Sequence, residues 1–213
     1  EQDLKFSPGD GHEYGNTGFV ILGIIIENVS KQSLVDFYHN EFFKPLGMKD
    51  TFLSSLDQGL EYQRGELHHT YPHRYFVIPT GAEPKFTPAK IPFLIAPFSD
   101  GGMVSTAKDM IKWHTALHNG KILSENSYKQ MVTAYGESKT KEGLPTSYGY
   151  GIFISKLADG QTLYSHAGNA IAIRSEFGYI PESKFCFAIL SNAMVYVPEE
   201  MKDKVDFSLP QNQ

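Results

Sequence analysis

Cysteine is nearly absent from this sequence of 213 residues, and that scarcity narrows its chemistry. The single cysteine, Cys186, has no second thiol with which to form an internal disulfide, so the fold must depend on a packed core. It lies in the apolar run 185–190, where we expect it to pack as a small hydrophobic side chain. One thiol leaves the redox compartment of the protein open.

An excess of positive charge is missing as well. Lys and Arg number 19 against 24 Asp and Glu, which gives a formal net charge of -5. Proteins that bind nucleic acids usually carry a basic patch, and no cluster of that kind occurs here. We therefore expect small-molecule or peptide ligands of neutral or mixed charge, and no nucleic acid partner.

Long apolar runs are absent too. The longest, residues 19–26, is far shorter than the roughly 20 residues that a membrane-spanning helix needs, so we expect a core element and no membrane span. The chain has neither a signal peptide nor an initiator methionine, and it opens as if within a longer protein. We expect its true N-terminus to lie upstream.

Apolar residues are nevertheless plentiful enough for a real core. They make up 41% of the chain, with aromatic residues at 13%, which suits one domain, or one domain and part of another. Apolar residues at helical spacing predict helical structure over three segments: 16–43, 105–119 and 124–131. Ser105 is the predicted N-cap of the second segment. Residues 54–98 show no clear period and exceed an ordinary loop, which favours a functional segment lining a cleft.

The pattern changes to a period of two in the last third of the chain. Residues 148–154 and 171–179 alternate as strands do, and 185–190 is apolar on both faces, as in a central strand. The short connection 181–184 predicts that the last two strands are antiparallel neighbours. Helices followed by such strands indicate an α+β fold.

A tyrosine and an asparagine stand directly in front of the first apolar run, in the stretch Tyr14-Gly-Asn16-Thr17. Taken alone, this stretch favours a helix start capped by Asn16 or Thr17. The sharper hypothesis is one corner of an active site, in which Tyr14 and Asn16 face the substrate.

Two formal Ser-x-x-Lys sequences offer candidate nucleophiles. Ser138 begins one of them in a polar, Gly-flanked stretch, which favours a solvated loop. Ser105 begins the other at the start of a predicted surface helix, where capping is the better interpretation. Histidines offer a further alternative, a metal-dependent hydrolase. His114 and His118 lie one helical turn apart and three more histidines occur over 68–73, but without a metalloprotease pattern, so surface or packing roles are favoured and no metal is expected.

Short sequence blocks in a fixed order carry a family resemblance. They are Phe6-Ser-Pro-Gly9, Tyr14-Gly-Asn16, Leu22-Gly-Ile-Ile-Ile-Glu27, Pro45-Leu-Gly-Met48, Gly101-Gly-Met-Val-Ser-Thr-Ala-Lys-Asp109, Tyr148-Gly-Tyr-Gly-Ile152 and His166-Ala-Gly168. In this order the chain resembles the serine β-lactamase and penicillin-binding-protein-like family, in its class C β-lactamase, D-alanyl-D-alanine carboxypeptidase and esterase branch. The resemblance implies a β-lactamase/transpeptidase-like fold, an antiparallel sheet flanked by helices, incomplete in this chain.

The resemblance also implies a domain assignment. Residues 1–213 would be the C-terminal portion of a single domain, mostly helix and loop over about 1–140 and sheet over about 143–192. Because the missing portion would complete the sheet, we expect an exposed strand edge and apolar surface. Self-association, or pairing with the missing N-terminal segment, would follow. Secretion or a periplasmic location is the localisation that the family favours.

The family uses three catalytic elements, and two of them have counterparts here. Tyr14 and Asn16 match its Tyr-x-Asn, a base and a substrate-amide ligand, while His166 and Gly168 match its Lys- or His-x-Gly strand. The Ser-x-x-Lys that would precede Tyr14 is absent, so this chain alone should be inactive. Histidine in place of lysine shifts the expectation from β-lactamase toward peptidase or esterase.

Elementary chemistry explains this grouping. A serine hydroxyl needs a neighbouring base, and a tyrosine can serve only if nearby cations lower its pKa from about 10. The missing lysine would do so, with His166 assisting. The backbone N–H of Asn169 can donate to a developing oxyanion. The whole protein would be a serine hydrolase acting on an amide or ester without a cofactor. The alternative is a non-catalytic module that recognises peptidoglycan fragments or a protein partner.

Overall fold

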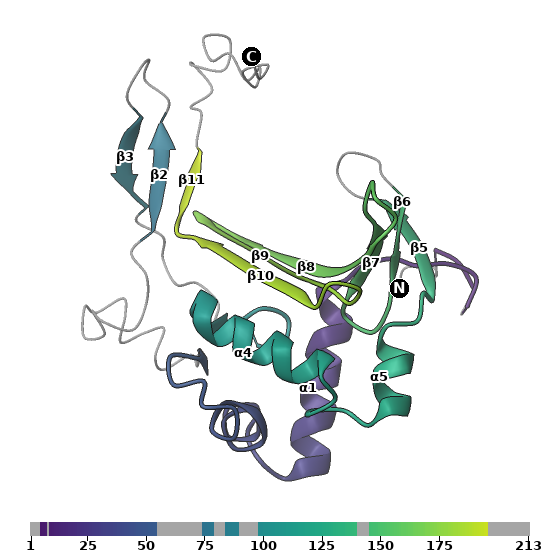
Figure 1. Ribbon diagram of the computed structural model, residues 1–213. Helices are drawn as coiled ribbons and strands as arrows, with labels where there is room; N and C mark the ends of the chain where they lie inside the picture. Colours follow the sequence, from purple (N-terminus) through teal and green to yellow (C-terminus); the bar gives the residue numbers. More distant parts are fainter. Residues whose placement is uncertain are drawn as a thin grey trace.

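The largest element of the fold is an antiparallel sheet of six strands, in the order β10-β9-β8-β7-β6-β5. The computed structural model describes residues 5–7, 9–54, 74–78, 84–89, 98–139 and 145–195. The strands are β5 (Gly136–Lys139), β6 (Pro145–Tyr148), β7 (Phe153–Lys156), β8 (Thr162–Ala170), β9 (Ile173–Ile180) and β10 (Phe185–Ser191). Figure 1 shows the helices gathered on one side of this sheet, which confirms the predicted α+β arrangement.

The sheet agrees with the strand predictions in all but one respect. β9 and β10 are antiparallel neighbours, as their short connection predicts. β10, however, is the outermost strand of the described sheet rather than a central one. Its apolar residues remain uncovered on one face, and Ile189 is 61% exposed. Ser138 and Lys139 lie in β5, so the prediction of a loop over 138–141 is wrong for its first two residues.

The segment predicted to be helical over 16–43 forms two helical parts that differ in direction, and the first part ends at residue 30. α1 (Asn16–Ser30) ends where Lys31 adopts a left-handed conformation. Ser33 then caps α2 (Leu34–Tyr38), which passes into the π-helix η1 (His39–Phe43). The N-cap of α1 is Gly15 and no side chain caps it, so the alternative that Asn16 or Thr17 caps this helix is wrong.

The helix α4 (Ala107–His118) packs against β9 and β10 and buries one face there. Its N-cap is Thr106, whose hydroxyl accepts from the backbone N–H of Asp109 at 3.3 Å. The prediction of Ser105 as N-cap is therefore wrong by one residue. Ser105 instead hydrogen-bonds through Oγ to Thr51 Oγ1 at 2.8 Å. The helix α5 (Glu125–Met131) is capped by Ser124 and agrees with the prediction of a helix over 124–131.

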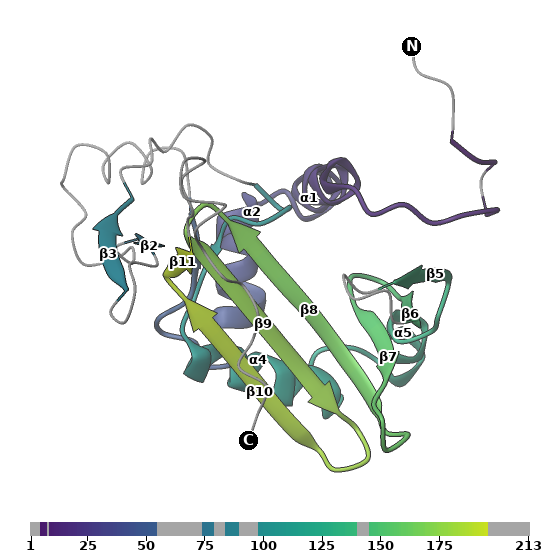
Figure 2. The same cartoon turned by 90° about the horizontal axis from the view of Figure 1, so that it is seen from above.

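Two smaller sheets flank the main one. β1 (Phe52–Leu53) pairs with β4 (Met103–Val104), and these two strands place residues 98–103 beside α1. β2 (Tyr75–Ile78), β3 (Lys85–Pro88) and β11 (Ala193–Val195) form the other, at the end of the main sheet away from β5 (Figure 2). Most of the segment predicted over 54–98 lies outside the described residues.

The apolar run at the start of α1 is not a core element in the described structure. Gly23 is the only buried residue of α1, and Phe98 and Ser99 approach it so closely that a Cβ would lie 2.2 Å from Ser99 Oγ. Four apolar side chains in the middle of α1 are about half exposed: Ile21, Leu22, Ile24 and Ile25. The expected core role is therefore wrong among the described residues, which expose apolar surface as predicted.

No single helix among the described residues is long and apolar enough to cross a membrane. The pair Asn16–Ser30 and Leu34–Phe43, bent by 82°, has the length and composition for a span when the two are taken together.

Candidate active site

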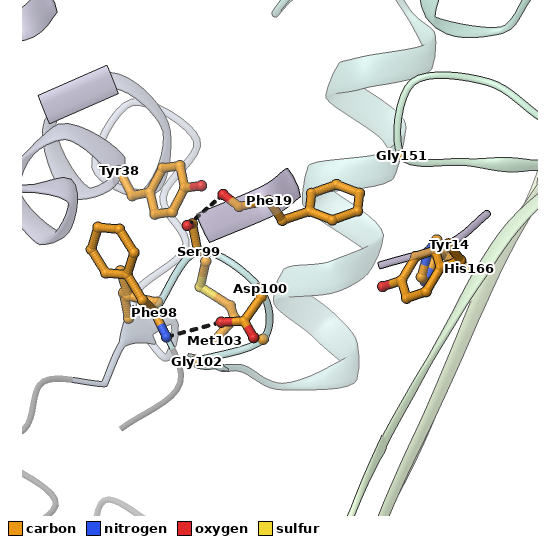
Figure 3. A pocket seen from close by; sticks show the side chains of 12 residues that line it. Tyr14, Phe19, Tyr38, Phe98, Ser99, Asp100, Gly102, Met103, Gly151 and His166 are labelled. Atoms are coloured by element: carbon orange, nitrogen blue, oxygen red, sulfur yellow. Dashed lines mark hydrogen bonds between the residues drawn. The ribbon is translucent and has the colours of Figure 1, made fainter. Parts of the chain in front are cut away.

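A cavity of about 230 Å³ lies between the start of α1, residues 98–103 and the strand β8. Its walls come from segments that are far apart in the sequence (Figure 3). The lining residues are Tyr14, Phe19, Tyr38, Leu53, Phe98, Ser99, Asp100, Gly101, Gly102, Met103, Gly151 and His166. Two of the predicted site residues, Tyr14 and His166, therefore meet at one cavity.

Tyr14 is held at this cavity by its ring rather than by its hydroxyl. The ring centroid lies 5.9 Å from those of Phe19, Tyr148 and His166. The side chain is 45% exposed, and its hydroxyl has no hydrogen-bond partner among the described residues. A phenol that is fixed in position but free at its oxygen can bind a substrate or transfer a proton.

His166 has both ring nitrogens in contact with hydrogen-bonding groups. Nδ1 lies 2.9 Å from the carbonyl oxygen of Ala167, which only accepts, so Nδ1 carries the proton. Nε2 therefore accepts from the hydroxyl of Tyr148 at 3.1 Å. Burial lowers the pKa of His166, and the hydrogen bond to Ala167 offsets part of that shift. The imidazole is neutral at pH 7, so it places no positive charge beside Tyr14.

The other predicted site residues adjoin the cavity without lining it. Asn16 is exposed as the first residue of α1, two residues beyond Tyr14. Gly168 and Asn169 follow His166 on β8. A Cβ at Gly168 would lie 2.3 Å from Ser175 Oγ on β9, so glycine permits the close approach of these two strands.

Beyond His166, one edge of β8 pairs with no other strand among the described residues. β7 pairs with β8 only from Thr162 to Ser165, whereas β9 continues alongside to Ala170. At the start of this ladder the N–H of Leu157 donates to the carbonyl of Gln161 at 2.9 Å. Because backbone groups alternate in direction along an antiparallel strand, odd-numbered residues of β8 face β7. By the same alternation, the N–H of Asn169 points to the open side.

Several lining residues were not predicted as site residues. Ser99 donates from Oγ to the carbonyl of Phe19 at 2.6 Å, and Asp100 accepts from the N–H of Phe98 at 3.2 Å. Gly151 reaches the cavity from the link between β6 and β7. Gly101–Met103 and Gly151 lie within the sequence blocks that carry the family resemblance, and that is the signal that marks them.

The alternative nucleophiles and metal ligands have other positions. Ser105 does not line the cavity, because its Oγ is held by Thr51. The described residues contain no group of three or more His, Cys, Asp or Glu side chains placed to hold a metal ion. His114 and His118 pack against the aromatic rings of β9, which confirms their predicted packing role. The histidines over 68–73 lie outside the described residues.

Comparison with known proteins assigns the family. The sequence pattern of the Beta-lactamase family matches residues 1–208, nearly the whole chain. This chain belongs to the β-lactamase family. Its fold is accordingly the β-lactamase/transpeptidase-like fold that the sequence blocks predict. Among solved structures, an octameric penicillin-binding protein homologue from Pyrococcus abyssi superposes with a TM-score of 0.70 at 29% identity, over 88% of this chain and 40% of that one.

Other relatives of this β-lactamase-family chain include named hydrolases. D-amino acid amidase from Ochrobactrum anthropi SV3, complexed with L-phenylalanine amide, gives a TM-score of 0.65 at 25% identity, over 87% of this chain and 51% of that one. A penicillin-binding protein of Bacillus subtilis is 27% identical over 76% of this chain and 36% of its own length. Unguisins hydrolase of Aspergillus campestris is 25% identical over 87% and 34%. The chain thus spans about a third of the length of these curated relatives.

Proposed function

We propose that the protein is a serine hydrolase that forms an acyl-enzyme on an amide or ester carbonyl, and that this chain supplies two of its three catalytic elements. The observation that carries the proposal is the hydroxyl of Tyr14, which has no hydrogen-bond partner among the described residues and lies at the same cavity as His166. Amide hydrolysis by relatives such as the D-amino acid amidase agrees with it.

Three of the predicted residues have direct roles in this mechanism. Tyr14 takes the proton of the nucleophilic serine and passes it to the leaving group. Asn16 binds the substrate amide through its carboxamide, which both donates and accepts. The N–H of Asn169, on the open side of β8, donates to the oxyanion together with the N–H of the nucleophile. Water then hydrolyses the acyl-enzyme.

The nucleophile is expected in a Ser-x-x-Lys element upstream of this sequence. Ser99 is the one serine among the residues that line the cavity, and its hydroxyl is already donated to a carbonyl. A cation near Tyr14 must also come from elsewhere, because His166 is neutral. The lysine of Ser-x-x-Lys would be that cation and would stabilise negative charge on the Tyr14 oxygen during proton transfer.

The walls of the cavity favour a substrate with an apolar, aromatic side chain. Phe19, Tyr38 and Phe98 contribute aromatic rings to the lining of the cavity. Asp100 is the only acidic residue of this lining. Together with the amidase relative, this lining supports the amide or ester of an apolar amino acid. D-phenylalanine amide is therefore the substrate to test first, followed by a p-nitrophenyl ester.

The direct test is active-site labelling of the longest natural form of the protein with a fluorescent fluorophosphonate, mapped by mass spectrometry. We expect the adduct on a serine of an upstream Ser-x-x-Lys. An adduct on Ser105 or Ser99 would overturn the assignment of the nucleophile. Heat-unfolded protein is the control for nonspecific reaction.

A non-catalytic recognition module is the second candidate, because Ser99, the one serine that lines the described cavity, donates its hydroxyl to the carbonyl of Phe19 rather than to a base. It predicts no fluorophosphonate adduct and no turnover of D-phenylalanine amide, but saturable binding of a peptidoglycan fragment. Full-length protein with no adduct and with such binding would favour this candidate over the hydrolase.

A further inference from the structure

A second cavity, of about 270 Å³, lies on the other side of Gly151 from the candidate active site. It is lined by residues of α4, of β9, of η1, of the segment 122–131 that includes α5, and of the link between β6 and β7. Its lining includes Phe42, Trp113, His114, Leu117, Met131 and Phe177. No Asp, Glu, Lys or Arg side chain lines it, so a charged ligand would lose its hydration without gaining an ion pair.

His114 is the feature that distinguishes this cavity from an ordinary packing defect. It is only 2% exposed, and neither Nδ1 nor Nε2 has a hydrogen-bond partner among the described residues. Buried polar groups in folded proteins are almost always hydrogen-bonded, so an exception calls for a missing partner. The ring cannot find that partner in Phe177, whose centroid lies 4.2 Å away, or in the stacked ring of His118.

The protonation state of His114 defines what that partner must be. Burial, and to a lesser degree His118, lowers the pKa of His114 to about 3. The imidazole is therefore neutral, with one N–H and one lone pair. A hydroxyl group matches it, because a hydroxyl can donate to the lone pair of one nitrogen or accept from the N–H of the other. His118 does not line the cavity: its Nδ1 is paired with the hydroxyl of Tyr128 at 2.7 Å, while its Nε2, like the nitrogens of His114, has no partner among the described residues.

We propose that this cavity is a binding site for a small uncharged aromatic molecule with one hydroxyl group, which hydrogen-bonds to His114. The ring of the ligand lies against Trp113, Leu117 and Phe177, and the volume suits a single ring rather than a cofactor-sized molecule. The site is separate from the candidate active site and does not depend on the proposed hydrolase activity.

The test compares 4-fluorophenol with 4-fluorotoluene by ¹⁹F NMR on the longest natural form of the protein. The two probes differ only in a hydroxyl against a methyl group. Because one hydrogen bond to a buried partner contributes a modest net free energy, we expect 4-fluorophenol to bind roughly fivefold more tightly. Failure of both probes to bind, or equal affinity for the two, would overturn the proposal and leave a site filled by water.

The variant His114→Leu tests the role of the imidazole. It removes both nitrogens at similar volume, so the preference for 4-fluorophenol should disappear while 4-fluorotoluene still binds. His39→Leu, the same change at an exposed histidine, should leave the preference intact. If His114→Leu does not fold, the imidazole ¹⁵N shifts of His114 in the unmodified protein decide the matter, because 4-fluorophenol must move them. Unchanged shifts, or a preference retained in His114→Leu, contradict the proposal.

Discussion

Tyr14, just before α1, and Tyr148, in β6, both have their rings beside His166. Their hydroxyl groups differ in hydrogen bonding. Tyr148 is buried, and its hydroxyl donates to Nε2 of His166 at 3.1 Å. Burial raises the pKa of Tyr148, with a smaller contribution from Tyr14, so this phenol stays protonated. Tyr14 is 45% exposed, and its hydroxyl has no hydrogen-bond partner among the described residues. Tyr148 is therefore a positioning residue for His166, whereas Tyr14 is available for proton transfer.

The variant Tyr148→Phe should lower stability through the loss of one buried hydrogen bond. Because Nε2 of His166 would be left without its donor, we expect the free energy of unfolding to fall by about 1 kcal/mol. Urea unfolding at pH 7 measures this change. An unchanged midpoint would show that the bond to His166 contributes nothing, and Tyr14→Phe, which removes a free hydroxyl, is the matched control.

At the scale of elements, α4 is held at its start by a small polar network. Asp109 is fully buried, and its carboxylate accepts from the N–H of Asp50 at 2.9 Å and from Lys112 Nζ at 2.6 Å. Thr106 caps the same turn. This network fixes the end of α4 against residues 50–51, and α4 in turn supports β9 and β10.

Loss of the cap gives a prediction for this element. Thr106→Ala should destabilise the protein by about 1 kcal/mol, because the N–H of Asp109 loses its acceptor. The exposed Thr115→Ala on the same helix is the control and should change little. Chemical denaturation of both variants measures the difference. Equal stabilities for the two variants would contradict the assignment of Thr106 as N-cap.

Local signals in the sequence predict most elements. The errors concern the position of one N-cap and whether a partner covers an element. Ser124 is the only cap candidate before α5, but Ser105 and Thr106 are adjacent hydroxyls, and backbone geometry alone decides between them. The apolar pattern of α1 predicts a helix correctly, yet pattern cannot say whether a partner covers that helix. The pattern of β10 likewise predicts a strand correctly, but it cannot say whether another strand pairs with each of its edges.

The candidate site, too, is predictable from the sequence only in part. Tyr14 and His166 were predicted together only through the ordered blocks, and the structure places both at one cavity. The bond between Tyr148 and His166 had no sequence signal, since both residues sit at ordinary strand positions. The neutral state of His166 follows from burial, which sequence spacing does not report.

Among the described residues, α1 and β10 both expose apolar surface. α1 presents Ile21, Leu22, Ile24 and Ile25, and β10 presents Ile189 along an unpaired edge of the described sheet. Exposed edges and apolar patches of this kind promote association with other chains.

We therefore expect this chain, purified alone, to self-associate. Analytical ultracentrifugation should detect species larger than a monomer, and Ile189→Lys should shift the distribution toward the monomer because a charged edge residue opposes pairing. Ile189→Val keeps the edge apolar and is the control. A monodisperse, cooperatively unfolding monomer would sink this prediction.

Acid should destabilise the molecule through its buried histidines. Burial lowers the pKa of His114 to about 3 and that of His118 to about 4, below the value of about 6.5 in an unfolded chain. The unfolded state thus binds more protons below pH 6.5, so the stabilising contribution is complete above that pH and declines as the pH falls toward 4. The slope is about 1.4 kcal/mol per pH unit for each uncharged imidazole.

Urea unfolding between pH 7 and pH 4.5 measures this slope. The variant His114→Leu should reduce it by about one proton, because the leucine has no charge to gain on unfolding. His39→Leu should retain the full slope. A His114→Leu protein with the same pH dependence as the unmodified protein would show that His114 does not titrate differently on unfolding.

The central claim is that the free phenol of Tyr14 transfers the proton in a serine hydrolase site, and hydrolysis of D-phenylalanine amide by Tyr14→Phe tests it most directly. In the longest natural form of the protein we expect kcat/KM to fall by roughly 10²–10⁴-fold, the usual contribution of a general base, with urea unfolding unchanged. Activity equal to that of the unmodified protein, at equal stability, would contradict the account.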